Sequence, residues 1–266
     1  IVRIDALPQR DAIGVIRDAD LLPPAPIPSV PSEFDGYRIN RQLHASSRSH
    51  IYAATDTRTG EAVALKVPSM DLRENQDYLR RFAMEEWIAR RVGSPHVLKA
   101  YPAQRERKTL YVVTELIQGQ TLRQWMDDNP KPDLETVRDI VEQIAIGLRA
   151  FHRKEMIHQD LRPENVMIDR DGTVKIIDFG AVRVAGVLEA VPELDTGDIL
   201  GTHQYAAPEY FVGDAGGPVS DLFALGVIAY ELLTGHLPYG AEMARATSRA
   251  QQSRISYRSV AGYRRD

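Results

Sequence analysis

The first half of the chain alternates hydrophobic with polar residues in short runs, which predicts β-strands. Alternation of this kind places every second side chain on one face of a sheet. Turn residues such as Thr57-Arg58-Thr59-Gly60 separate two of the runs. The strands that we expect are Tyr37–Leu43, Ile51–Asp56, Ala62–Val67, Val97–Tyr101 and Leu110–Glu115. One helix, Leu72–Val92, is expected among them.

After Gly119 the spacing of hydrophobic residues becomes helical. They recur three and four positions apart from Leu134 to Phe151, as in an amphipathic helix. Val219–Leu233 is almost entirely apolar, and we expect this helix to be buried on all sides. A short hairpin around Asp169–Gly172 lies between the two helices. Strands followed by helices predict an α+β fold with a β-rich lobe, 34–117, a helical lobe, 118–266, and a cleft between them.

Most residues before the first lobe lack both patterns. Ile1–Ile4 is the exception, since it alternates like the end of a strand. Prolines then recur from Pro8 to Pro31, and each one fixes its own backbone and removes a hydrogen-bond donor. We therefore expect an extended linker at about residues 8–33, and a remnant of a preceding domain before it.

Composition excludes several classes of function. The 266 residues include no cysteine, so disulfides and thiolate chemistry are excluded. A net charge of −4 argues against a nucleic-acid partner bound by bulk electrostatics. No apolar run approaches the roughly 20 residues of a membrane span. The chain begins without methionine, so we expect a fragment of a longer protein. We expect a cytoplasmic location, at the membrane face if the full-length chain is tethered there.

Acidic and amide side chains flank the predicted hairpin. Asp160 and Asn165 come directly before it, and Asp178 follows it, so the three can converge on one point. Mg²⁺ prefers oxygen ligands that it shares with substrate phosphates, which suits Asn165 and Asp178. Asp160 is then available to orient and deprotonate an attacking hydroxyl. The alternative is that these are ordinary turn residues.

These segments resemble the eukaryotic-type protein kinase family, whose signature includes a strand lysine, a catalytic loop, Asp-Phe-Gly and Ala-Pro-Glu. The resemblance covers about residues 34–250. It is carried by Ala64-Leu65-Lys66, His158-Gln159-Asp160-Leu161-Arg162-Pro163-Glu164-Asn165, Asp178-Phe179-Gly180 and Ala207-Pro208-Glu209. It implies a bilobal fold, ATP with Mg²⁺ (or Mn²⁺) as cofactors, and protein Ser/Thr hydroxyls as acceptors.

The resemblance assigns roles to the charged residues. Lys66 would hold the α- and β-phosphates, paired with Glu85 from the helix. Glu86 is the alternative partner, and a strand-edge lysine with no such role is a further alternative. Asp160 would be the catalytic base, and Arg162 would contact the γ-phosphate with a wider fork than lysine offers.

Other residues are assigned by position within the family pattern. Thr114 would lie at the back of the adenine pocket, or pack as an ordinary strand residue. Thr202 would hydrogen-bond Asp160, and Asp221 would brace the catalytic loop or only cap its helix. The expected nucleotide-binding residues are Leu43, Ile51, Ala64, Lys66, Thr114, Glu115 and Ile117. The expected substrate platform is Thr202, Ala207, Pro208 and Glu209.

The sequence departs from the family at three places. His44, Ser46 and Ser49 stand where three glycines are expected, so the loop either uses serine hydroxyls and Arg48 for phosphate or is only a polar hairpin. Gln159 replaces an arginine that receives an activation-loop phosphate, so we expect activity without that phosphorylation. The last helices are absent, with the arginine that pairs with Glu209.

Several short segments also resemble those of bacterial bifunctional proteins, which join a metal-dependent phosphatase to a kinase and often carry a membrane span. These include Ser94-Pro95-His96-Val97-Leu98-Lys99 and the loop 45–50. The resemblance implies a phosphatase domain upstream. Two other classes of function compete with an active protein kinase: a pseudokinase scaffold, suggested by the altered loop, and a small-molecule kinase, against which the Ala-Pro-Glu segment argues.

Overall fold

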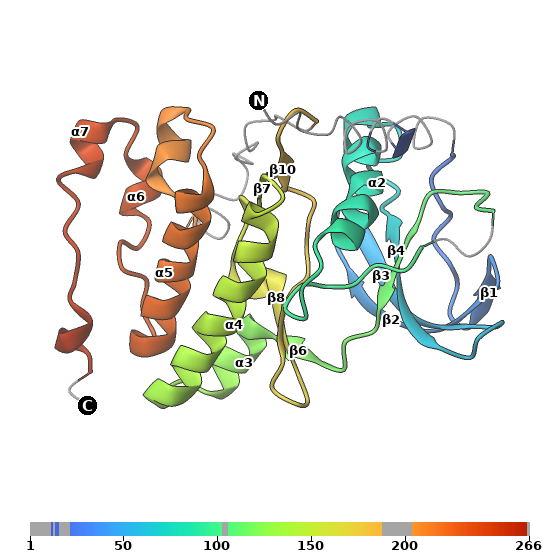
Figure 1. Cartoon of the computed structure of the whole chain (residues 1–266), viewed down its shortest axis with the longest axis horizontal. Coiled ribbons are helices and arrows are strands. Elements are labelled where there is room, and N and C mark those ends of the chain that lie inside the picture. The colour runs from blue at the N-terminus through green and yellow to red at the C-terminus, as the bar shows by residue number, and fades with distance from the viewer. Residues whose placement is uncertain (1–11, 13, 16–21, 103–105, 188–203, 265–266) are drawn as a thin grey trace, which may run out of the picture. The chain divides into compact units, whose positions relative to one another are not determined.

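The computed structural model describes residues 12, 14–15, 22–102, 106–187 and 204–264. They form two compact units (Figure 1). The sheet unit comprises the residues up to Gly93 together with Leu98–Gln118, and the helical unit comprises Ser94–Val97 and the residues from Gly119 onward. The predicted strand end Ile1–Ile4 and the platform residue Thr202 lie outside the described residues. The expected fold class, α+β with strands before helices, is confirmed.

The sheet unit holds an antiparallel five-stranded sheet whose strands follow sequence order. Its strands are β1 (Ser32–Phe34), β2 (Tyr37–Ala45), β3 (Ser49–Asp56), β4 (Ala62–Pro68) and β5 (Val112–Glu115). The predicted strand Val97–Tyr101 is wrong. Val97 bridges Ile176 of the helical unit, whereas Ala100 bridges Thr114 of the sheet unit, so the pairing partner changes before a ladder can form.

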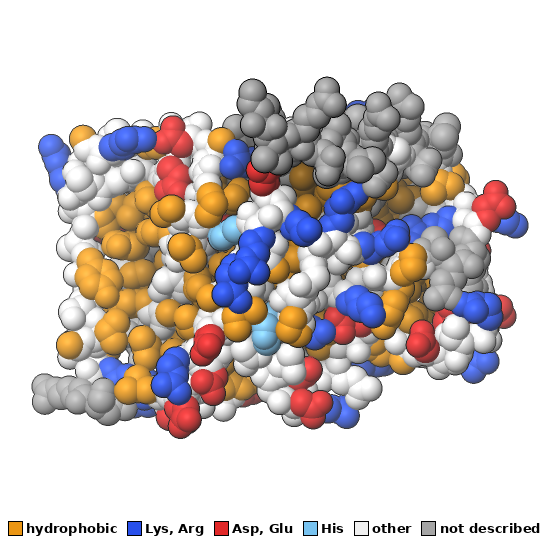
Figure 2. Space-filling model, in the orientation of Figure 1, with side chains coloured by type: hydrophobic (Ala, Val, Ile, Leu, Met, Phe, Trp, Pro, Cys, Tyr) orange, Lys and Arg blue, Asp and Glu red, His pale blue; other side chains and the backbone are white. Residues whose placement is uncertain are grey.

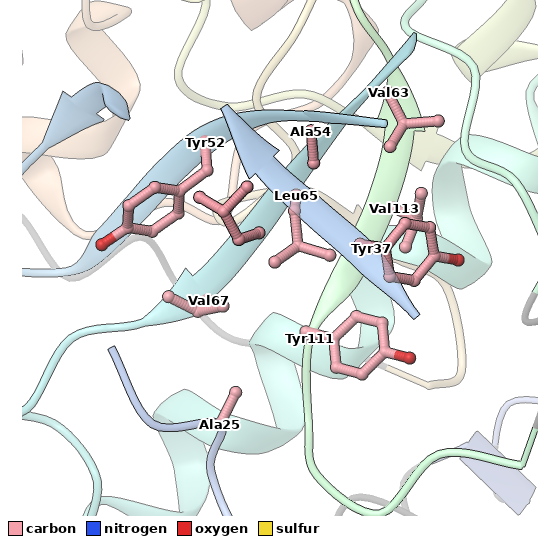
Figure 3. Close-up of a cluster of buried hydrophobic side chains, with 10 residues drawn as sticks. Ala25, Tyr37, Tyr52, Ala54, Val63, Leu65, Val67, Tyr111 and Val113 are labelled. Carbon is pink, nitrogen blue, oxygen red and sulfur yellow. The ribbon is translucent and has the colours of Figure 1, made fainter. Parts of the chain in front are cut away.

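Alternation along β4 sorts its side chains onto two faces. Val63, Leu65 and Val67 are buried in a core with Tyr52 and Tyr111 (Figure 3). Burying a side chain such as Leu65 contributes about 1.5–3 kcal/mol. Ala64 and Lys66 therefore point to the opposite face.

The single long helix of the described sheet unit, α2 (Gln76–Arg91), covers that opposite face. Its residues Leu79 and Phe82 pack with Val112 of β5. The helix begins four residues later than predicted because the Asn75 side chain accepts a hydrogen bond from Tyr78 N at 3.0 Å, which caps the helix there.

The helical unit combines helices with two small sheets. Its helices are α3 (Leu122–Asp128), α4 (Leu134–His152), α5 (Pro218–Thr234), α6 (Glu242–Arg245) and α7 (Arg249–Gln252). A three-stranded sheet has the order β6 (Gly119–Thr121), β8 (Val166–Asp169), β9 (Val174–Ile176), and β7 (Met156–Ile157) pairs with β10 (Arg183–Val184). β8 and β9 confirm the predicted hairpin around Asp169–Gly172. The strands β6, β7 and β10, of two or three residues each, carry too little periodicity to be predicted.

The expectation that the apolar helix α5 is buried on all sides is wrong. Val219 is 73% exposed and Leu222 is 51% exposed, both near the start of the helix. Full burial requires neighbours on every side, and α4 supplies them on one face. Figure 2 shows hydrophobic side chains gathered over the region that Figure 1 labels α5 to α7. None of the helices in the described part of the chain is both long and apolar enough to cross a membrane.

The predicted proline linker is extended but packed against the sheet unit. We call its described part, residues 22–31, the proline segment. Ala25 is fully buried in the core shown in Figure 3, and Leu22 packs against the cluster under α2. Proline content predicts an extended backbone, but it does not reveal what that backbone lies against.

Candidate active site

In the sheet unit, Lys66 forms an ion pair with Glu85. Lys66 Nζ lies 2.5 Å from Glu85 Oε2, and the two side chains are only 17% and 10% exposed. The ammonium also lies 5.7 Å from the centroid of the Phe82 ring. Glu86, the alternative partner, pairs with Arg107 Nη1 at 2.6 Å instead. The structure therefore brings together Lys66 and the glutamate that the sequence favoured.

The other predicted nucleotide residues of this unit lie on β2 to β5, except Ile117, which follows β5. Ile51 is the register partner of Lys66, and Ala64 is the partner of Thr114, so these four line adjacent strands. Thr114 is buried, and its hydroxyl donates to the Glu115 carbonyl at 3.2 Å.

The backbone of Glu115, at the end of β5, is hydrogen-bonded through both of its groups. Its N–H donates to Lys99 O at 2.9 Å, and its carbonyl accepts from the Thr114 hydroxyl at 3.2 Å. Ile117 follows β5 and is half-buried, whereas Leu43 on β2 is 37% exposed.

The glycine-free turn between β2 and β3 is held by serine. Ser46 Oγ accepts hydrogen bonds from Arg48 N at 3.2 Å and Ser49 N at 3.1 Å. Ser69 Oγ donates to Ser47 O at 2.5 Å from outside the turn. The Ser46 hydroxyl and two amides are thus used within the turn, which favours the polar-hairpin alternative at these positions. Arg48 and Ser47 keep exposed side chains.

In the helical unit, the catalytic loop brings Asp160 and Asn165 together. Asn165 Nδ2 donates to Asp160 O at 2.8 Å and to Asp160 Oδ2 at 2.9 Å. The Asn165 carbonyl accepts from Ile177 N at 3.0 Å, which places Asp178 next to the loop. Gly180 N donates to Asp178 Oδ1 at 3.0 Å. A backbone turn and a hairpin therefore assemble all three residues predicted to converge.

The negative charges of Asp160 and Asp178 repel one another. Burial raises the pKa of the Asp160 carboxyl, and the negative charge of Asp178 raises it further. Asn165 Nδ2 makes both of the hydrogen bonds described for this side chain, so Oδ1 is the atom that could serve as a metal ligand. Two carboxylates and an amide oxygen fit a hard divalent cation, which offsets their charge and takes further oxygens from phosphate.

Asp221 braces the catalytic loop from α5. It is 1% exposed and accepts hydrogen bonds from His158 N and Gln159 N, each at 2.9 Å. His152 Nε2 lies 2.8 Å from the same carboxylate. The helix cap is Gly217, four residues earlier, so the capping alternative for Asp221 does not apply. Gln159 adopts φ 66°, a strained left-handed conformation that these bonds hold in place.

Aromatic packing links the loop to the Asp-Phe-Gly segment. The ring centroid of Phe151 in α4 lies 5.6 Å from the ring centroid of His158 and 5.6 Å from that of Phe179. Phe179 directly follows Asp178, and its buried ring fixes the backbone at this point. The Phe151 ring packs edge-to-face with His158 and at a tilt against Phe179, and this buried packing supports the position of both acidic residues.

Sequence reasoning missed a cluster of charged residues centred on Arg123. Its guanidinium lies 3.0 Å from Glu231 of α5 and 3.3 Å from Glu164 of the catalytic loop. Glu164 in turn accepts from Arg162 Nε at 2.7 Å. Burial would lower the pKa of Arg123, but Glu231 and Glu164 raise it overall. Thr121 and Gln124 form a capping box that predicts the helix of Arg123, but no local signal names its partners.

Tyr205 belongs to the same cluster. Its hydroxyl donates to Glu231 and lies within hydrogen-bond distance of Arg123. Burial raises the pKa of this hydroxyl, and the charge of Glu231 raises it further, so it stays protonated as a donor. The cluster thereby joins four segments: the start of α3, the catalytic loop, α5 and the residues just before Ala207.

The described part of the platform is compact. Ala207 is buried, and Pro208 begins a short 3-10 helix that runs to Val212. Glu209, expected to lack its arginine, accepts a hydrogen bond from Ser220 Oγ. Gln252 Nε2 of α7 donates to Pro208 O at 2.7 Å. Thr202 cannot be placed against Asp160, since it lies outside the described residues.

Comparison with known proteins places the chain in a family. A family model described as protein kinase domain matches residues 37–261. The serine/threonine-protein kinase PrkC of Bacillus subtilis is 30% identical over 208 residues, which cover 78% of this chain and 32% of PrkC. PknA of Corynebacterium glutamicum is 33% identical over 208 residues, covering 76% of this chain and 44% of PknA.

A third relative, PknL of Mycobacterium tuberculosis (strain H37Rv), is 33% identical over 208 residues, covering 78% of this chain and 51% of PknL. The chain thus spans about a third to a half of the length of these curated relatives. Members of the family use ATP and Mg²⁺, which matches the donor set around Asp160. The chain therefore belongs to the protein kinase family, and the relatives that it resembles are bacterial serine/threonine-protein kinases.

Proposed function

We propose that this chain transfers the γ-phosphoryl group of ATP to serine or threonine hydroxyls of protein substrates. The observation that carries the proposal is the assembled set of Asp160, Asn165 and Asp178 in the helical unit. The kinase relatives support the same reaction. Phosphoryl transfer needs little covalent help, so positioning and charge stabilisation are the tasks for these residues.

Asp160 orients the acceptor hydroxyl and takes its proton. Asn165 fixes the carboxylate through Oδ2, which leaves Oδ1 of Asp160 to face the substrate. A carboxyl whose pKa is raised by burial is a better proton acceptor once it is ionised. General base and orientation effects of this kind contribute about 10²–10⁴-fold in rate.

Asn165 Oδ1 and Asp178 would hold Mg²⁺, which supplies positive charge to neutralise the phosphate oxygens. Lys66 would bind the α- and β-phosphates, with Glu85 holding the ammonium in place. Arg162 would bind the γ-phosphate, and Glu164 fixes the direction of its guanidinium. Leu43, Ile51, Ala64, Thr114, Glu115 and Ile117 would surround the adenine.

The test uses the full-length protein with γ-labelled ATP, Mg²⁺ and a generic protein substrate, followed by identification of the phosphorylated residues. Phosphoserine or phosphothreonine is expected, and Asp160→Ala and Lys66→Ala should each abolish it. Asp171→Ala and Lys108→Ala are matched controls, because both side chains are exposed and outside the proposed site. Both controls should retain full activity.

A lack of transfer by the unaltered protein would overturn the proposal, and nucleotide binding would then separate the alternatives. Binding of ATP without transfer would indicate a nucleotide-dependent scaffold, the reading suggested by His44, Ser46 and Ser49. Labelling of an antibiotic or sugar but no protein would indicate a small-molecule kinase. An upstream phosphatase domain, a membrane tether and a cytoplasmic location stay predictions from the sequence.

A further inference from the structure

The proline segment pairs with the chain just before β5. Ala25 N donates to Leu110 O at 3.2 Å, and Leu110 N donates to Pro23 O at 2.8 Å. These bonds form a parallel bridge between Pro24 and Leu110. In the order of the five-stranded sheet, β5 is the last strand, and sheet edges bind other extended segments. Ala100 bridges Thr114 of β5, and the proline segment meets the chain at Leu110, two residues before this edge strand begins.

Side chains of the proline segment reach both faces of the sheet at this edge. Ala25 is fully buried in the core with Tyr111 and Val113. Leu22 packs against the cluster under α2 on the other face. This cluster consists of Leu79, Phe82, Ala83, Leu110 and Val112. Hydrophobic contact on both faces is not expected of a linker that only joins two domains.

A polar contact ties the proline segment to the start of α2. Arg73, in the turn before the helix, donates from Nη2 to Ala25 O at 2.6 Å. A guanidinium hydrogen bond to a carbonyl is charge-assisted and therefore stronger than a neutral one. Backbone bonds, apolar packing and this contact all act on the same four residues, 22–25.

The surface under Leu22 is continuous with the Lys66 ion pair. Phe82 belongs to the cluster, and its ring lies 5.7 Å from Lys66 Nζ. Glu85 lies one helical turn further along α2 and binds the same ammonium. A shift of α2 that follows the loss of Leu22 packing would therefore move Phe82 and Glu85 together.

We propose that α2 and residues 110–112 form a docking surface for the chain's own residues 22–25, and that this docking holds Glu85 against Lys66. These residues lie outside the part of the chain that matches the kinase family, 37–261. Whatever displaces them from the surface loosens α2 and weakens the ion pair. The catalytic consequence rests on the proposed function, whereas the docking itself does not.

Hydrogen exchange of α2 in the full-length protein tests the docking. Leu22→Asp places a charge against the apolar cluster, and Arg73→Gln removes the bond to Ala25. Both should raise amide exchange in residues 76–91 by about tenfold or more, because local opening becomes easier. Ile27→Asp is the matched control, since Ile27 is exposed on the same segment. Leu22→Met should behave like the unaltered protein.

Kinetics then test the consequence for catalysis. Leu22→Asp and Arg73→Gln should raise KM for ATP about three- to tenfold, with Ile27→Asp unchanged. Unchanged exchange of α2 in both variants would overturn the docking proposal. Faster exchange with unchanged KM for ATP would overturn its link to Glu85. If no form of the protein transfers phosphate, the proposed function fails, and the exchange data still decide whether residues 22–25 dock.

Discussion

The two units hold their charged residues in different ways. In the helical unit, Asp160 is fixed by Asn165, five residues along the same loop. The backbone just before Asp160 is held as well, because His158 N and Gln159 N donate to the buried Asp221. In the sheet unit, Lys66 is fixed by Glu85, nineteen residues away on a separate helix. Hydrogen bonds within a short loop leave the Asp160 side chain few alternative positions. The Lys66–Glu85 ion pair joins two long side chains, so its geometry depends on the position of α2.

This difference predicts different consequences of damage. A defect in the helical unit removes support from the backbone itself, so stability and activity should fall together. A defect in the sheet unit loosens an ion pair, so nucleotide kinetics should change more than stability. The sheet unit is therefore the more suitable place for regulation, and the docked proline segment lies there.

The largest effect is expected for Asp221→Ala. The change leaves the N–H groups of His158 and Gln159 without their acceptor in the buried interior. It also releases a strained backbone at Gln159. We expect the free energy of unfolding to fall by about 3–5 kcal/mol, as measured by denaturant titration. Asp214→Ala, at an exposed ion pair, is the control and should cost less than about 1 kcal/mol.

A smaller effect, on activity more than stability, is expected for Glu85→Gln. The neutral amide keeps one hydrogen bond to Lys66 but loses the charge that holds the ammonium. Steady-state kinetics should show kcat/KM for ATP reduced about 10–100-fold. Glu86→Gln is the matched neighbour, because Glu86 pairs with Arg107 instead. A Glu86 defect as large as the Glu85 defect would mean that the two glutamates share the role.

A still smaller effect concerns pH and the Arg123 cluster. Burial would raise the pKa of Glu164, but the bond to Arg162 and the nearby guanidinium charges lower it below its ordinary value of 4.5. The folded state therefore favours the ionised form, and this stability is present above that value. It is lost as pH falls and Glu164 becomes protonated in the folded protein.

Thermal unfolding between pH 6 and pH 3 measures this contribution. Glu164→Gln should flatten the acid loss of stability by less than about 1 kcal/mol, since the side chain is partly exposed. Glu135→Gln, at the exposed first turn of α4, serves as the comparison. An unchanged acid slope in Glu164→Gln would show that the pair with Arg162 contributes nothing to folding.

The smallest effect is expected for Thr196→Ala, which should leave activity unchanged. Thr196, Thr202 and Tyr205 are the hydroxyl residues of the sequence between Gly180 and Ala207, where the family places its activation-loop phosphate. Gln159 carries no charge for an activation-loop phosphate, and its Nε2 donates to Ala215 O at 3.2 Å instead. Initial rates of peptide phosphorylation by the two proteins should agree within about twofold. Loss of most activity in Thr196→Ala would show that loop phosphorylation matters despite the neutral amide.

Local sequence was sufficient wherever the interacting residues are near neighbours. Alternation predicted β2, β3 and β4 within a few residues of their observed bounds, because strand pairing of hairpins is local. The hairpin after the catalytic loop likewise placed Asp160, Asn165 and Asp178 at one point. Family resemblance selected Glu85 over Glu86, a choice that periodicity alone does not make, since neighbouring helix residues differ by only about 100°.

Tertiary structure decided what depends on distant partners. Arg123 meets Glu231, 108 residues away, and no pattern in either segment indicates the other. The same holds for Leu22 and Ala25, whose composition predicts only an extended backbone. The exposed face of α5 is a further case. The sequence shows that this helix is apolar, but it does not show how many other elements pack around it. The sequence alone determined the local elements and the chemistry that they carry, whereas packing between remote segments determined which side chains support them.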